Sequence, residues 1–344
     1  MTRVLYIDDS PVAQKVLIDM LNEDSSLEVV GRGWNGAEAV RLARRLKPDV
    51  IVMDVNMPVM DGWEATAAIM ASDPTPIVLI TATYDLRDSS LSVRAMDAGA
   101  IALVDKPMRR GTDNFKAQAE GLISTVKVMA NMNLVTRRAR VQPQPPPSAL
   151  GGAAIDLVAI AASTGGPLAL AKILSALPRD GATPIVVVQH ITPGFAAGLV
   201  DWLNGVTDLR VSVAQDGETL RSGCVFLAQT GSHLGVTRSH VALHEGPPIE
   251  GHRPSATHLF RTVAKAFGPR ALGVILTGMG ADGAAGLMDL KKAGGHVLAQ
   301  DEGSSVVYGM PKEAVATGAV DQILHLDDIA LTIAKGWAAR ARAR

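Results

Sequence analysis

The chain has 344 residues, of which 47% are apolar and 19% are charged, and its formal net charge is −1. A single hydrophobic core stops growing at about 250–300 residues, so this length predicts two domains. The apolar content excludes a disordered chain, the near-zero net charge disfavours a nucleic-acid-binding protein, and the single cysteine excludes an internal disulfide framework and suits a reducing compartment.

The first 125 residues alternate between short apolar segments and segments with helical periodicity. Five predicted strands with four helices between them indicate a doubly wound, parallel α/β sheet of the flavodoxin-like type. The strands are expected at residues 4–7, 27–30, 50–53, 77–80 and 101–104, with helices such as 11–21 and 37–46 between them.

Reactive side chains follow several of these strands. Asp8 and Asp9 follow the first strand, Asp54 follows the third, Thr81 ends the fourth and Lys106 follows the fifth. In a doubly wound sheet, ligands bind beyond the carboxyl ends of the strands. Three converging carboxylates favour Mg²⁺, and a hydroxyl and an ammonium beside them suit a phosphoryl group on Asp54.

Residues 1–125 resemble a two-component receiver domain. The resemblance implies that Asp54 accepts phosphate from a histidine kinase, that Asp8, Asp9, Asp54 and the Asn56 carbonyl form the Mg²⁺ site, and that Thr81 and Lys106 are the switch residues. One position departs from the family, because Leu103 stands where receivers often have an aromatic residue. The matching motifs are Asp8-Asp9, the segment from Asp54 to Gly62, Thr81-Ala82 and Lys106-Pro107.

Residues 137–152 are rich in proline and glycine and carry three arginines, which favours an extended linker. This segment is either a passive spacer or, together with a helical stretch at about 115–135, an arm that couples two domains. The expected boundaries are a receiver domain at 1–125, a linker at 126–152, a catalytic domain at 153–336 and a basic tail at 337–344.

The second half repeats the alternation of strands and helices and predicts a second, mostly parallel α/β sheet. Between about 209 and 245 the rhythm changes to short segments broken by glycine, and we expect an antiparallel β-hairpin insertion there. The predicted strands are 157–161, 185–188, 272–276, 296–299 and 320–324.

Three potential catalytic residues follow strands of this second sheet. Ser163 follows the first strand, His190 ends the second and Asp282 follows a third. After Ser163, two glycines and a proline indicate a tight turn into a helix. A serine, a histidine and an aspartate at one sheet edge are the nucleophile, general base and orienting acid of acyl transfer. The order Ser–His–Asp and the absence of Gly-x-Ser-x-Gly disfavour an α/β-hydrolase. The alternative is a helix-capping Ser163 beside a structural His190.

Two other motifs suggest different chemistry. The glycines at 278, 280 and 283 match a dinucleotide fingerprint, with Asp301 as the acid after the next strand, but Asp282 would place a carboxylate where a pyrophosphate binds and only 61 residues follow. Five histidines could suggest a metal site, but their spacing matches no zinc motif and we expect scattered loop histidines. They are His233, His240, His244, His252 and His258.

Residues 155–335 resemble the catalytic domain of the chemotaxis protein-glutamate methylesterases, the CheB family. The resemblance implies hydrolysis of glutamyl methyl esters on chemoreceptors, and often deamidation of receptor glutamines, without a cofactor in the catalytic domain. It implies that Ser163 attacks, His190 shuttles the proton and Asp282 orients His190, with Thr164 and Met279 at the oxyanion site. The matching segments are Ala162–Pro167, Gln189-His190, Gly251–Ser255, Leu276–Gly283 and Tyr308–Pro311.

The implied protein is an enzyme gated by phosphorylation, whose unphosphorylated receiver occludes the active site. Its expected partners are a kinase and the cytoplasmic helices of methylated receptors, with no nucleic acid. The N-terminus does not read as a signal peptide and no apolar stretch reaches about 18 residues, so we expect a cytoplasmic protein without a membrane span. The alternatives are a response regulator that acts by docking alone and, with less support, a transcription factor.

Overall fold

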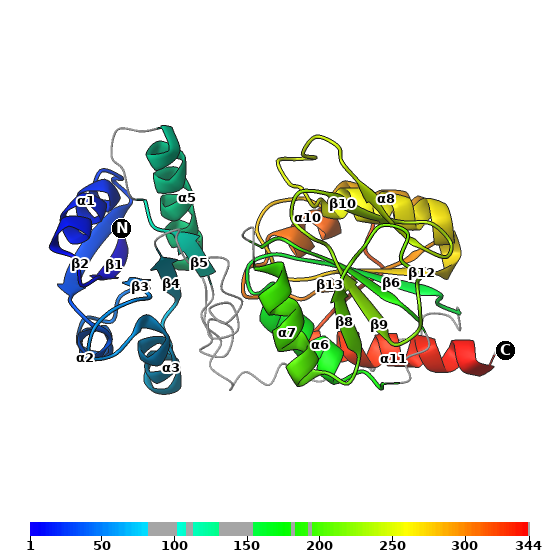
Figure 1. The fold of residues 1–344 in the computed structure, drawn as a ribbon, viewed down its shortest axis with the longest axis horizontal. Coiled ribbons are helices and arrows are strands. Elements are labelled where there is room, and N and C mark those ends of the chain that lie inside the picture. The colour runs from blue at the N-terminus through cyan, green and yellow to red at the C-terminus, as the bar shows by residue number, and fades with distance from the viewer. Residues whose placement is uncertain (82–101, 108–112, 131–153, 180–182, 192–194, 343–344) are drawn as a thin grey trace. The chain divides into compact units, whose positions relative to one another are not determined.

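The structure is a computed structural model that divides into two compact units, residues 1–136 and 137–344, which are described separately below. Among the helices described here, none is long and apolar enough to cross a membrane. The structure describes residues 1–81, 102–107, 113–130, 154–179, 183–191 and 195–342 (Figure 1).

The first unit is built on the parallel five-stranded sheet that the sequence predicts. Its strand order is β2-β1-β3-β4-β5, so β1 pairs with both β2 and β3. All five residues of β3 and of β4 are buried, as expected for parallel strands covered on both faces. The strands are β1 (Thr2–Ile7), β2 (Leu27–Gly33), β3 (Val50–Asp54), β4 (Ile77–Thr81) and β5 (Ala102–Asp105).

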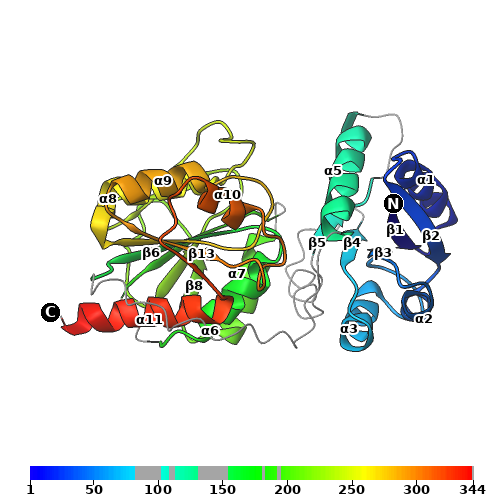
Figure 2. The same cartoon turned by 180° about the vertical axis from the view of Figure 1, so that it is seen from behind.

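Helices cover both faces of this sheet, with α1 and α5 on one face and α2 and α3 on the other (Figures 1 and 2). Local caps fix where they begin: Ser10 accepts a hydrogen bond from a backbone N–H of α1, and Asp61 and Glu64 form a capping box on α3. The helix expected before β5 falls in residues 82–101, outside the described residues. The helices are α1 (Pro11–Asn22), α2 (Gly36–Leu46), α3 (Gly62–Ser72) and α5 (Asp113–Ala130).

Helix α5 continues past the predicted domain boundary at residue 125. Val126 and Met129 lie on its buried face and are fully shielded from solvent, so they belong to the core of the first unit. The predicted linker therefore started too early, because this helix turns its apolar residues toward the sheet.

The second unit contains a seven-stranded sheet of order β14-β13-β12-β6-β7-β9-β8. Strands β6, β7 and β12, which precede the candidate catalytic residues, are neighbours in the middle of the sheet and are buried along their whole length. The strands of this sheet are β6 (Leu157–Ala162), β7 (Ile185–Gln189), β8 (Arg210–Val213), β9 (Cys224–Leu227), β12 (Ala271–Ile275), β13 (His296–Gln300) and β14 (Gln322–Leu324).

The expected antiparallel insertion at 209–245 is only partly correct. Strands β8 and β9 are parallel members of the main sheet, with β9 paired to β7. Only β10 (His233–Val236) and β11 (Val241–His244) form an antiparallel hairpin. The hairpin packs its apolar residues into the core that also holds α8 (Ala256–Phe267). Short alternating segments do not by themselves specify which strand they pair with, so the sequence could not distinguish these arrangements.

Helices α8, α9 and α10 cover one face of the sheet, and α6, α7 and α11 cover the other (Figures 1 and 2). Helix α11 passes the predicted boundary at 336, since Trp337 is buried and its indole N–H donates to the hydroxyl of Thr183. The expected tail therefore starts inside a packed helix. The helices are α6 (Gly166–Ser175), α7 (Ala196–Val206), α8 (Ala256–Phe267), α9 (Ala284–Lys292), α10 (Met310–Ala316) and α11 (Leu326–Arg342).

Candidate active site

The register of the second sheet brings the ends of β6 and β7 together. Ala162 pairs with Gln189, so the next residues, Ser163 and His190, leave neighbouring strands at the same level. The backbone N–H of His190 donates to the Ala162 carbonyl at 2.9 Å and continues the ladder. Because adjacent strands lie about 4.8 Å apart, this register places the serine and the histidine side by side at the carboxyl edge.

The turn that carries Ser163 is held by its own backbone. The Ser163 N–H donates to the Thr277 carbonyl at 3.0 Å, and its carbonyl accepts from the Gly166 N–H at 2.8 Å. Gly165 has a φ of +77°, and a Cβ there would overlap Val306. Only glycine satisfies both the left-handed backbone and the close approach of Val306, which explains the tight turn predicted from the sequence.

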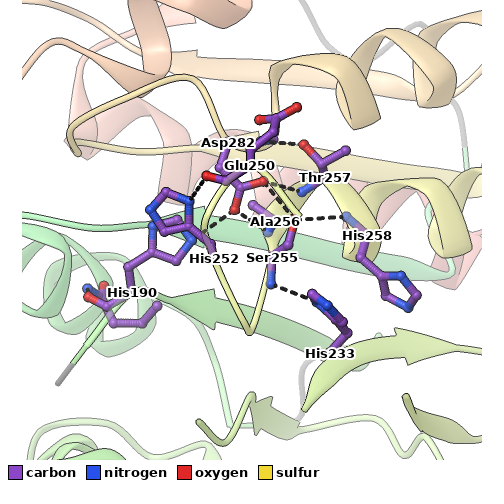
Figure 3. Close-up of polar contacts among 11 residues, drawn as sticks. His190, His233, Glu250, His252, Ser255, Ala256, Thr257, His258 and Asp282 are labelled. Atoms are coloured by element: carbon purple, nitrogen blue, oxygen red, sulfur yellow. Dashed lines mark hydrogen bonds and ion pairs between the residues drawn. The ribbon is translucent and has the colours of Figure 1, made fainter. Parts of the chain in front are cut away.

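Asp282 reaches the site from the loop between β12 and α9 and meets the N-terminus of α8 (Figure 3). Its Oδ1 accepts from the Ser255 hydroxyl at 2.8 Å and from the Thr257 N–H at 2.9 Å. Its Oδ2 accepts from the Ala256 N–H at 2.7 Å and from His190 Nε2 at 2.9 Å. Four donors therefore surround one fully buried carboxylate.

These donors keep Asp282 ionised. Burial would raise the pKa of its carboxyl group, but the hydrogen bonds from His190, Thr257, Ala256 and Ser255 outweigh it and hold the pKa well below the usual range. The dipole of α8, whose positive end lies at these N–H groups, also favours a negative charge at this point.

The bond to Asp282 fixes the tautomer of His190. An ionised carboxylate only accepts, so Nε2 carries the proton and Nδ1 keeps its lone pair. Among the residues described here, Nδ1 is buried and has no hydrogen-bond partner. The structure thus brings His190 and Asp282 into contact, and it places Ser163 on the neighbouring strand end without a hydrogen bond from its hydroxyl to Nδ1.

His252 stacks on the ring of His190, a contact that the sequence did not define. The ring centroids are 4.1 Å apart and the planes differ by 12° (Figure 3). Its Nδ1 lies 2.9 Å from the Glu250 carbonyl, to which it donates. Burial, and after it the neighbouring His190, lower the pKa of His252.

The two residues expected at the oxyanion site border the same edge. The Thr164 carbonyl accepts from the Thr277 hydroxyl at 2.9 Å, and Met279 follows Gly278, whose N–H donates to the Val307 carbonyl at 3.0 Å. Within the described residues, the backbone N–H groups of Thr164 and Met279 make no hydrogen bond to the protein. Both groups can therefore donate to a developing oxyanion.

The turn that matched a dinucleotide fingerprint serves the same site. Gly278 packs against the Ser163 side chain, since a Cβ on it would lie 2.7 Å from the serine Cβ. The acid of this turn, Asp282, points to the N-terminus of α8, where it accepts from the N–H groups of Ala256 and Thr257. The turn therefore contributes one packing contact and one acid to the candidate active site.

Three of the five histidines set aside as scattered in fact gather. His233, His244 and His258 stack, with centroid separations of 5.0 Å between His233 and His258 and 5.7 Å between His244 and His258. His233 is fully buried and both its ring nitrogens are engaged, one with the Pro247 carbonyl and one with the Ser255 N–H. This cluster therefore packs the hairpin on α8, and His233 has no ring nitrogen free for a metal.

The first unit carries the second reactive cluster. Lys106 Nζ lies 2.7 Å from Asp54 Oδ2 and 2.8 Å from Asp8 Oδ2, and Asp8 also accepts from the Tyr6 hydroxyl at 2.7 Å. Burial, more than any neighbour, raises the pKa of Asp54. Burial alone would lower the pKa of Lys106, but its hydrogen bonds to Asp54 and Asp8 raise it. The ammonium therefore stays charged beside the carboxylate.

The other predicted residues of this cluster surround it. Asp9 is exposed, but one of its oxygens lies within 4.8 Å of ligand oxygens of Asp8 and Asp54. Thr81 is buried at the end of β4, and its carbonyl accepts from the Lys106 N–H at 2.8 Å. Asn56 lies exposed two residues after Asp54. Three converging carboxylates fit a hard divalent cation. The side chain of Leu103 lies outside what the structure describes.

The sequence did not reveal the residues that support the candidate catalytic groups. Ser255 was part of a matched segment, yet its two roles, N-cap of α8 and donor to Asp282, were not foreseen. A serine one residue before an amphipathic helix is a recognisable N-cap signal. In the sequence, Gln189 stands out only as the neighbour of His190.

Comparisons with known proteins agree with this arrangement. A sequence profile described as CheB methylesterase matches residues 158–333, and one described as response regulator receiver domain matches residues 4–113. The chain is 44% identical over 335 residues to protein-glutamate methylesterase/protein-glutamine glutaminase 4 of Myxococcus xanthus, covering 95% of each chain. It is 46% identical over 337 residues to protein-glutamate methylesterase/protein-glutamine glutaminase 3 of Anaeromyxobacter dehalogenans, covering 96% of this chain and 97% of that one.

A solved structure covers the second unit. The crystal structure of the Thermotoga maritima CheB methylesterase catalytic domain is 36% identical and superimposes with a TM-score of 0.52, covering 53% of this chain and 98% of that one. The matched profiles and relatives span both units, with the receiver first and the methylesterase second.

Proposed function

Because the chain belongs to the CheB methylesterase family, we propose that its second unit hydrolyses glutamyl methyl esters on chemoreceptors and that its receiver controls this activity. The observation that carries the proposal is the His190–Asp282 pair beside Ser163. The pair leaves the lone pair of Nδ1 free in a buried position one strand away from a serine at a helix N-terminus.

The proposed reaction has two steps. The Ser163 hydroxyl attacks the ester carbonyl while Nδ1 of His190 takes its proton, and the negative charge on the former carbonyl oxygen is held by the N–H groups of Thr164 and Met279. The intermediate collapses, the bond to methoxide breaks, and His190 returns the proton so that methanol leaves. Water then attacks the acyl-serine by the same route and releases glutamate.

Asp282 orients and supports His190 in both steps. Its charge favours the imidazolium that forms when Nδ1 takes the serine proton, and its four hydrogen bonds keep it from turning away. The same steps on a glutamine side chain would release ammonia, so receptor glutamine deamidation belongs to the proposal. No cofactor is required in this unit.

The receiver is proposed to take a phosphoryl group from a histidine kinase onto Asp54. Asp8, Asp9, Asp54 and the Asn56 carbonyl would hold Mg²⁺, which supplies positive charge against the phosphoryl oxygens. Lys106, which is paired with Asp54, and Thr81, at the end of β4, would contact the phosphoryl group. With these partners the chain would act in the cytoplasm.

The decisive experiment compares the wild type with Ser163→Ala in a methanol-release assay on methylated receptor membranes, with and without a small-molecule phosphodonor. We expect the variant to stay folded and to lose at least about 10³-fold in rate. The alternative, a regulator that acts by docking alone, predicts equal methanol release from both proteins, and that result would refute the proposal.

A further inference from the structure

The last residue of β7, Gln189, joins the backbones that carry the two reactive side chains. Its amide nitrogen, Nε2, donates to the carbonyl of Ser163 and to the carbonyl of His190, both at 2.8 Å. The side chain is buried, with 2% of the residue exposed. We propose that Gln189 is a positioning residue that fixes the spacing between the nucleophile and the general base.

The chemistry of the contact explains why an amide stands here. Both acceptors are backbone carbonyls, so the group between them must present two N–H donors, and a primary amide does so in one plane. A carboxylate has no hydrogen-bond donor and would repel the two carbonyl oxygens. An apolar side chain would also lack donors, so packing alone would set the distance between the two turns. Gln189 thus donates one N–H hydrogen to each of the two carbonyls.

The other end of the amide points to a functional reason for this residue. Its oxygen, Oε1, is buried and makes no hydrogen bond within the described residues. An unpaired buried acceptor destabilises a fold, so stability alone does not account for the side chain. We attribute the retention of this unpaired oxygen to the function of the two N–H donors, which hold Ser163 and His190 in place.

Gly166 keeps the amide in place. A Cβ on Gly166 would overlap Oε1 of Gln189, so the helix that follows the nucleophile can approach only because this residue has no side chain. The Gly166 N–H donates to the Ser163 carbonyl, which also accepts the hydrogen bond from Gln189 Nε2. The glycine at 166 and the glutamine at 189 therefore form one unit around the backbone of Ser163.

This role rests on the proposed hydrolase function, because spacing matters only if the Ser163 proton passes to His190. A displacement of about 1 Å between reacting groups costs about 10²-fold in rate. Loss of the Gln189 contacts should therefore lower kcat and leave KM nearly unchanged, since the amide is buried and its two donors are bonded to backbone carbonyls.

The test is Gln189→Met, which keeps length and volume and removes both donors. We expect kcat for methanol release to fall 10- to 100-fold, with KM within twofold of the wild type, and faster hydrogen–deuterium exchange in segments 162–166 and 189–191. The control is Thr332→Val, which removes a buried hydroxyl bonded to the Asp328 carbonyl in α11 and should leave kcat within twofold.

A double-mutant cycle separates positioning from general stability. Gly166→Ala should displace the amide and lower kcat by a similar factor. Because both substitutions act on the same amide, together they should lower kcat by less than the product of their separate effects, although the new Cβ also meets the Ala162 Cβ in both backgrounds. Should Gln189→Met fail to fold, Gly166→Ala alone is judged by the same kcat, KM and exchange criteria.

Three results would overturn the inference: a kcat within twofold of the wild type, multiplicative effects of the two substitutions, or unchanged exchange in both segments. The exchange measurement does not depend on the substrate. A wild type that releases no methanol would instead count against the proposed function, and the exchange data would still decide whether Gln189 holds the two turns.

Discussion

Replacing Asp282 with asparagine tests whether this carboxylate orients the general base. Four donors point at the two carboxylate oxygens, so an asparagine, which has only one oxygen, must turn its NH₂ group toward two of them. If the NH₂ takes the Oδ2 position, it faces Nε2 of His190, and the imidazole must move its proton to Nδ1. That tautomer removes the lone pair proposed to accept the Ser163 proton.

The other orientation costs less but still weakens the site. With NH₂ at the Oδ1 position, the Ser255 hydroxyl can rotate to accept, while the Thr257 N–H loses its acceptor. One buried N–H without a partner costs about 1–3 kcal/mol, and the remaining bonds lose their charge assistance. We therefore expect Asp282→Asn to destabilise the second unit by about 2–4 kcal/mol and to lower kcat by about 10²–10⁴-fold.

The assay measures kcat and KM for methanol release together with thermal unfolding. Asp289→Asn is the matched control, because it makes the same change at an exposed carboxylate of the second unit, which is paired with Arg261. Surface ion pairs contribute about 0–1 kcal/mol, so this variant should change stability and kcat little. An Asp282→Asn protein with kcat within threefold of the wild type would refute the orienting role.

The pH dependence of stability gives a second check on Asp282. Its pKa is lower in the folded protein than in the unfolded chain, so the carboxylate stabilises the fold above the ordinary value of about 3.9 and loses this contribution as the pH falls below it. The difference in unfolding free energy between the wild type and Asp282→Asn should therefore shrink below about pH 4. A difference that stays constant between pH 7 and pH 3 would contradict the assigned hydrogen bonds.

Three further outcomes are expected. Mg²⁺ at millimolar concentration should raise the unfolding temperature of the wild type and leave Asp9→Asn unchanged, as measured by calorimetry; equal shifts would place the cation elsewhere. The lowered pKa of His252 means that its protonation favours the unfolded chain, so wild-type stability should fall as the pH drops below about 6.5, and His252→Phe should show a smaller fall in denaturant titrations at pH 7.5 and 5.5. Removal of residues 1–136 should raise basal methanol release if the receiver mainly restrains the second unit, whereas a truncated protein slower than the intact unphosphorylated one would show that the receiver is needed for activity.

The positions of residues that directly follow strands could be predicted from the sequence. Ser163 and His190 were predicted because β6 and β7 are buried apolar runs whose ends are visible in the sequence, and parallel strands bring such ends to one edge. Asp54 and Lys106 were predicted in the same way and lie 2.7 Å apart. Local periodicity is enough to locate the strand ends, and in any parallel sheet the carboxyl ends of the strands lie at the same edge.

Contacts between distant segments were not predictable in this way. The sequence shows short alternating segments at 209–245, but it does not show that β9 pairs with β7, since pairing depends on which edge of the sheet remains free. The stacking of His252 on His190 joins residues 62 positions apart, and the bond from Gln189 to Ser163 depends on a backbone turn that forms only in the folded chain. No periodic pattern encodes these contacts.

The N-terminus of α8 shows why orientation of the base and stability of the fold cannot be separated here. A helix begins with N–H groups that lack partners, and Ser255 satisfies one of them locally by accepting from the His258 N–H. The N–H groups of Ala256 and Thr257 are satisfied instead by Asp282, which comes from a loop beyond the next strand. The carboxylate that is bonded to His190 therefore also completes the cap of α8. A substitution at Ser255 should consequently change both the unfolding free energy and kcat, because the same hydroxyl caps the helix and donates to the acid.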